Sequence, residues 1–100
     1  MKKRSVILLG SAKRDLQSLV EYLAREISVS VARNYIGRVQ KRLSTLEYGA
    51  QRGTIRNAKT GLRVIGILPN TSVAFVVDDN EVHVLRILHG GRTLEQEDGD

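Results

Sequence analysis

The sequence predicts an α+β domain: an N-terminal strand, an antiparallel helical hairpin, and then a three- to four-stranded antiparallel sheet. Residues 11–46 repeat apolar side chains at spacings of three and four, the helical period, with one interruption. Residues 61–89 contain three short runs rich in Val, Ile and Leu, separated by the turn sequences Pro69-Asn70 and Asp79-Asn80. A block of helices beside a block of strands is typical of helices packed on one face of an antiparallel sheet.

The N-terminal part predicts an edge strand followed by a helix. Residues 3–9 hold a short apolar run after a basic lead-in, and they predict the first strand. The run is too short for the hydrophobic region of a secretory signal, and charged residues follow it at once. Ser11 is expected to cap the first helix. The apolar stripe of this helix consists of Leu16, Leu19, Val20, Leu23 and Ile27.

A second amphipathic helix follows after a short break. Ser28-Val29-Ser30 interrupts the helical period and supplies hydroxyl groups that can cap a new helix. Gly49 is expected to end this helix in the left-handed conformation. Two amphipathic helices with so short a connection are expected to pack antiparallel. The second apolar stripe consists of Ala32, Tyr35, Ile36, Val39, Leu43 and Leu46.

The strands that follow are expected at residues 61–68, 71–77 and 81–89, after a short irregular strand within residues 51–59. In the last strand, apolar residues occur at both the even-numbered and the odd-numbered positions. Strict alternation places Val82 and Val84 on the same face as Arg86.

Two helices can cover only one face of a sheet. The second face, with Val82 and Val84 or with their neighbours of opposite parity, is therefore expected to bind a partner.

The length of 100 residues fits one domain. We expect residues 1–92 to form it and residues 93–100, which hold four of the 11 acidic residues, to form a flexible acidic tail. Because the chain has no cysteine, disulfides and thiolate metal sites are excluded, and the composition fits the cytoplasm. No apolar run approaches the ~20 residues that span a bilayer, so no membrane association is expected.

The net charge of +5 predicts an acidic partner, either a nucleic acid or an acidic protein. Arg52, Arg56 and Lys59 form the expected basic patch, and Arg63 follows closely. Aromatic residues make up only 4% of the chain, which argues against the base-stacking surfaces of single-strand binders.

No set of residues typical of a catalytic centre can be assembled, and neither a metal site nor a cofactor is expected. His83 and His89 are six residues apart on one strand, or about 20 Å, which is too far to bind one metal ion together. Asp78 and Asp79 have the composition of an ordinary turn. Arg63 and Arg86 lie on strands, where each guanidinium group can either pair with a carboxylate of this chain or bind an anionic group of a target.

Several sequence features resemble the ParE branch of the RelE/ParE superfamily, the toxins of type II toxin–antitoxin systems. Gly61-Leu62-Arg63 begins a strand, and Ala12-Lys13-Arg14-Asp15-Leu16 begins a helix, as in that family. Ala74-Phe75-Val76-Val77 departs from it, because relatives commonly have a Tyr-Arg pair there. Further similar positions are Tyr22, Tyr35, Arg86, Leu88, His89, Gly90 and Arg92.

The resemblance implies a small basic toxin that acts by binding DNA gyrase and is neutralised by a cognate ParD-like antitoxin. DNA would be reached through gyrase or through the antitoxin complex. The residues expected to support target binding are Arg63, Arg86, His89, Gly90, Gly91 and Arg92. Those expected to contact the antitoxin are Leu16, Leu19, Tyr22, Leu23 and Tyr35.

Two alternatives stay open at this point. One is a RelE-like endoribonuclease that cleaves mRNA on the ribosome, and the other is a relative that has lost activity and only binds its antitoxin. Acid–base chemistry needs a group within hydrogen-bond reach of the reacting atoms. The chain has no tyrosine after Tyr48, which leaves only His83 and His89 for such a role and favours binding over catalysis.

Overall fold

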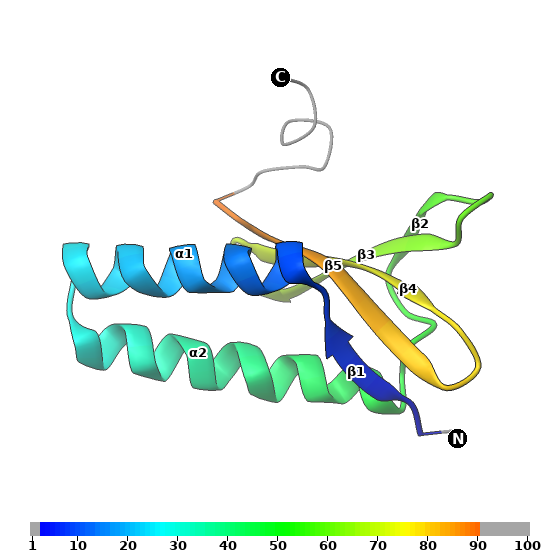
Figure 1. Ribbon diagram of the computed structural model, residues 1–100, viewed down its shortest axis with the longest axis horizontal. Helices are drawn as coiled ribbons and strands as arrows, with labels where there is room; N and C mark the ends of the chain where they lie inside the picture. The colour runs from blue at the N-terminus through cyan, green and yellow to red at the C-terminus, as the bar shows by residue number, and fades with distance from the viewer. Residues whose placement is uncertain (1–2, 91–100) are drawn as a thin grey trace.

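The computed structural model describes residues 3–90, which form a helical hairpin and a five-stranded mixed sheet (Figure 1). This arrangement confirms the predicted α+β class. Residues 91–100 lie outside the described part, so the domain boundary at residue 92 and the acidic tail remain predictions. In chain order the elements are β1 (Ser5–Leu8), α1 (Gly10–Glu26), α2 (Val29–Ser44), a 3₁₀ turn (Thr45–Glu47), β2 (Thr54–Asn57), β3 (Leu62–Leu68), β4 (Thr71–Val77) and β5 (Glu81–His89).

The strands are arranged in the order β1-β5-β4-β3-β2. β2 to β5 pair antiparallel, as predicted, and β1 joins the outer edge of β5 in parallel. β1 pairs only with the first part of β5, from Glu81 to Val84. The outer edge of β5 beyond Val84 therefore lies past the end of β1, where α1 begins.

The helix boundaries confirm one capping prediction and contradict two. The Ser28 side chain accepts a hydrogen bond from the Val31 amide at 3.0 Å and caps α2, as expected. Ser11 does not cap α1, because Leu9 is the N-cap and its own amide still donates to the Val84 carbonyl of the sheet. Gly49 does not adopt the left-handed conformation, because α2 ends earlier and tightens into the 3₁₀ turn.

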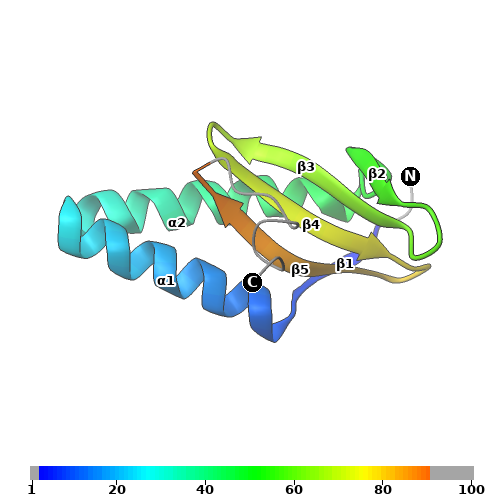
Figure 2. The ribbon, with the colours of Figure 1, turned by 90° about the horizontal axis from the view of Figure 1, so that it is seen from above.

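The two helices meet the sheet differently (Figure 2). α2 lies across one face of the sheet, whereas α1 lies alongside the β5 edge. The main core forms between the helices and the sheet, with Phe75 and Val39 fully buried in it. The far half of the hairpin extends past the sheet, where Leu19, Leu23 and Ala32 pack against one another in a second, smaller cluster. Ile27, which was expected in the apolar stripe, ends α1 and is exposed.

A β-bulge in β5 contradicts the strict alternation expected for this strand. Val84 is opposite Phe75, but the next position of β4, Ala74, is opposite Arg86, so Leu85 is an extra residue. Val82 and Val84 consequently face the helices and are fully buried, while Arg86 lies on the other face. That other face is not an open apolar surface beside Arg86, because Ala74 and Leu88 are buried there.

Within residues 3–90, no helix combines the length and the apolar character needed to cross a membrane.

Candidate functional site

A groove of about 630 Å³ separates α1 from the C-terminal end of β5. One face of α1 supplies its first wall, because the helical period brings positions 15, 18, 19 and 22 to the same side. β5 supplies the other wall. Among residues 3–90, those that line the groove are Asp15, Ser18, Leu19, Tyr22, Arg86, Ile87, His89 and Gly90.

Asp15 and Arg86 join the two walls of this groove. Arg86 donates from Nε to Asp15 Oδ2 at 2.7 Å and from Nη2 to Asp15 Oδ1 at 3.0 Å, which makes a bidentate ion pair. The backbone amide of Ile87 donates to the same Oδ2 at 2.9 Å. The Asp15 carboxylate thus accepts from the β5 edge at the point where β1 has ended, and it fixes α1 against the sheet. Of the two alternatives expected for the strand arginines, Arg86 follows the first, because it pairs with a carboxylate of this chain.

His89 is held from the core side of the groove. Its Nδ1 lies 3.3 Å from the Thr71 hydroxyl, which also bonds the Tyr35 hydroxyl. The Tyr35 and His89 rings meet edge to face, with centroids 6.1 Å apart. Thr71 is almost completely buried. These contacts fix the imidazole orientation, so that its Nδ1 points to the protein while His89 itself lines the groove.

Gly90 ends β5 in a conformation that favours glycine. Its φ angle is +72°, and its amide donates to the Asn70 carbonyl at 2.9 Å. Asn70 also has a positive φ, in the turn that Pro69 begins, which confirms the turn predicted there. Gly91 and Arg92, which were expected to bind the target, lie outside the described residues.

Arg63 does not join Arg86 and His89 in the groove. It is opposite Phe75 in the β3–β4 register, whereas Arg86 is opposite Ala74, and adjacent positions of a strand point to opposite faces. Arg63 instead lines a separate cavity of about 220 Å³ with Arg4 and Asp79. The expected target-binding residues therefore line two separate cavities, Arg63 in one and Arg86, His89 and Gly90 in the other.

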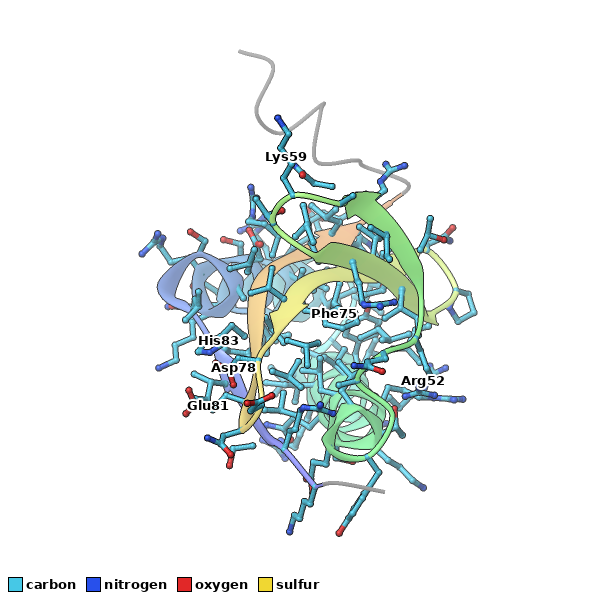
Figure 3. The ribbon with its side chains drawn as sticks, turned by 90° about the vertical axis from the view of Figure 1, so that its right-hand side faces the viewer. Arg52, Lys59, Phe75, Asp78, Glu81 and His83 are labelled. Atoms are coloured by element: carbon cyan, nitrogen blue, oxygen red, sulfur yellow. The ribbon has the colours of Figure 1, made fainter. Side chains whose placement is uncertain are left out.

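The expected basic patch is also dispersed. Arg52 is tied to the end of the helical hairpin, because it donates to the Gly49 carbonyl at 2.8 Å and to the Thr45 hydroxyl at 2.7 Å. Lys59 lies in the exposed loop between β2 and β3, well away from Arg52 in Figure 3. Arg56, on β2, is exposed too. Arg52 and Lys59 therefore do not form one site, and all three side chains add positive charge to the surface.

The expected antitoxin contacts differ in how accessible they are. Tyr22 is exposed and lines the α1–β5 groove. Leu19 and Leu23 are buried between the helices, although Leu19 borders the groove. Tyr35 is half-buried under Thr71. Leu16 borders a second, mostly apolar groove of about 390 Å³ on another side of α1.

Sequence reasoning missed Asp15 as a site residue. Asp15 lies four positions before Leu19 and seven before Tyr22, so the three residues share one face of the helix. A carboxylate at the start of an apolar series indicates a cation or amide partner on the surface that the helix packs against, because an unpaired buried charge is costly. The position of Asp15 on the helix thus indicates that it has a partner, but the identity of that partner, Arg86, depends on the β5 bulge.

The chain matches the family model described as "ParE toxin of type II toxin-antitoxin system, parDE" over residues 6–94. The fold is similar to that of a solved chain of the chromosomal ParDE toxin–antitoxin system from P. aeruginosa, with a TM-score of 0.74 and 19% identity over 87% of this chain and 96% of that one. It is also similar to a conserved hypothetical protein from Helicobacter pylori, with a TM-score of 0.56 and 21% identity over 89% and 97% of the two chains. At these identities the likeness shows the fold. A comparison with curated proteins gave no match.

Proposed function

Because this chain belongs to the family of ParE toxins of type II toxin–antitoxin systems, we propose that it arrests bacterial growth by binding DNA gyrase and that a cognate ParD-like antitoxin neutralises it. The observation that carries the proposal is the family match, which spans nearly all of the described residues. This target requires the protein to act in the cytoplasm.

The chemistry of the α1–β5 groove supports recognition of a polypeptide over cleavage of RNA. A nuclease needs cations directed at the scissile phosphate and an acid–base group beside it. Within the described residues, the guanidinium group in the groove is paired with Asp15, and the nearby imidazole is oriented by Thr71. What the groove offers is an exposed tyrosine, Tyr22, next to paired charges. An aromatic side chain beside polar groups is typical of protein interfaces.

The antitoxin is proposed to lie along α1. This helix has an open groove on each of two sides, one bordered by Leu16 and the other by Leu19 and Tyr22. A segment with apolar and acidic side chains would bury the apolar walls and complement the net positive charge of the chain. Such a segment would also cover His89 and Gly90, so antitoxin binding would block the residues proposed to meet gyrase.

Controlled expression in bacteria tests the proposed function in cells. We expect growth arrest with loss of plasmid supercoiling, and recovery when the antitoxin is co-expressed. His89→Ala and Arg92→Ala are expected to weaken the arrest, whereas Lys59→Ala, in the exposed β2–β3 loop, is expected to leave it intact. Full toxicity of both the His89 and the Arg92 variant would contradict the assignment of the C-terminal segment to the target.

A further inference from the structure

The hairpin between β4 and β5 brings two carboxylates and an imidazole together. The Asp78 amide donates to the Glu81 carbonyl at 2.9 Å, which closes the turn. Glu81 and His83 are two positions apart on β5 and therefore point to the same side of the strand. Asp78, at the end of β4, reaches them across the hairpin, and Figure 3 shows the three residues gathered at this end of the molecule.

The Asp78 carboxylate is fixed by the turn with one oxygen available. Its Oδ1 accepts hydrogen bonds from the Asn80 and Glu81 amides at 2.8 and 2.7 Å. These backbone donors, together with the contact to His83, lower the pKa of Asp78 below its ordinary value. Oδ2 is left to approach His83 Nε2, at 3.2 Å.

The distances from the His83 imidazole to the two carboxylates match those between neighbouring metal ligands. His83 Nε2 lies 3.2 Å from Asp78 Oδ2 and 3.4 Å from Glu81 Oε1, and the three ligand atoms lie within 4.8 Å of one another. Nitrogen and oxygen ligands bind Zn²⁺ at about 2.0–2.2 Å, so neighbouring ligand atoms at octahedral or tetrahedral angles are roughly 2.8–3.6 Å apart. The two measured imidazole–carboxylate distances fall in this range.

We propose that Asp78, Glu81 and His83 form a binding site for a divalent transition-metal ion of the zinc type. One imidazole with two carboxylates is a donor set that suits Zn²⁺ and its neighbours better than Mg²⁺ or Ca²⁺, which prefer oxygen ligands alone. Two carboxylates also neutralise the charge of one divalent ion. Three ligands from the protein leave further coordination positions to water or to a partner.

The site differs from the sequence expectation, which considered His83 only together with His89. It lies outside the α1–β5 groove, which none of its ligands lines, and Asp78 borders the separate cavity that Arg63 lines. It would act on the turn that holds the N-terminal strand: Arg4 Nε donates to the Asp78 carbonyl at 2.8 Å, and the Ser5 amide donates to the Asn80 carbonyl at 3.0 Å. A bound ion is therefore expected to stiffen the contact between β1 and the hairpin.

Calorimetric titration of the full chain, without a histidine tag, with Zn²⁺ tests this proposal. We expect one ion per chain at a site that depends on His83. His83→Ala is expected to lower the affinity at least about tenfold, because even the loss of a group that only orients a ligand costs 10- to 100-fold. The chain provides a matched control, since His89→Ala removes its other histidine and is expected to leave the affinity unchanged.

Asp78→Asn provides a second test if the His83 variant fails to fold. The amide oxygen of asparagine keeps the acceptor that the turn uses but removes the second carboxylate oxygen, so affinity is again expected to fall at least about tenfold while the fold is retained. The absence of one-to-one binding by the parent chain would overturn the proposal. Equal affinities of the parent, the His83 variant and the Asp78 variant would overturn it as well, and would assign the ion to other carboxylates.

Discussion

Replacing Asp15 with alanine is expected to lower the free energy of unfolding by about 3 kcal/mol, the lower end of the range for breaking a buried ion pair. The lower end applies because the Asp15 and Arg86 side chains are still 18% and 23% exposed. The substitution leaves the Arg86 guanidinium without its carboxylate and the Ile87 amide without its acceptor. Since α1 is fixed to β5 through this carboxylate, the α1–β5 groove is expected to widen as well.

Urea denaturation of the parent and variant measures this effect. Arg14→Ala is a suitable control, because the neighbouring Arg14 is exposed and donates only to Ser11 among the described contacts that involve its side chain. Its effect is expected to stay within about 0.5 kcal/mol. The double variant Asp15→Ala/Arg86→Met removes both charges and is expected to recover part of the loss. A cost below about 1 kcal/mol for Asp15→Ala would show that the pair behaves as an exposed salt bridge.

Replacing Tyr22 with alanine is expected to weaken the complex with the antitoxin about 30-fold, corresponding to the loss of ~2 kcal/mol typical of a tyrosine at the centre of an interface. Tyr22 is 49% exposed in the free chain and lines the α1–β5 groove, so a bound segment can bury its ring without rearranging the core. The stability of the toxin alone is expected to change little, because the side chain is largely in solvent.

Tyr48→Ala is the matched control for this substitution. Tyr48 has nearly the same exposure, 51%, but follows the 3₁₀ turn and lines neither groove beside α1. Affinities of both variants for the antitoxin are measured by calorimetry. Equal affinities of the two variants would contradict the placement of the antitoxin along α1.

The order of the elements and the turns between the later strands could be predicted from local sequence signals. Pro69-Asn70 and the turn after Asp78 delimit β4 and β5 where the apolar runs end, and Ser28 separates the helices. Which side chains of β5 face the helices could not be predicted in this way. The bulge at Leu85 follows from how β4 and β5 pair, and one extra residue reverses which side chains face the helices.

The candidate site was predicted only in part, for the same reason. The C-terminal part of β5 was identified, and His89 and Gly90 do line the groove. Arg63 is a strand arginine in a similar family motif, but the pairing of β3 with β4 places it opposite Phe75, whereas His89 is opposite Thr71 at the other end of β4, and the two residues line separate cavities. Asp15 and Arg86 are 71 positions apart, so no local pattern relates them.

Gyrase supercoiling with purified components tests the central claim most directly. The toxin is added to gyrase and relaxed plasmid, with and without the antitoxin, and a parallel sample measures mRNA cleavage on translating ribosomes. We expect supercoiling to be blocked or cleaved DNA to accumulate, the antitoxin to restore activity, and mRNA to stay intact. Unaffected gyrase together with cleaved mRNA would contradict the proposed target and would assign His89 to a ribosome-dependent nuclease.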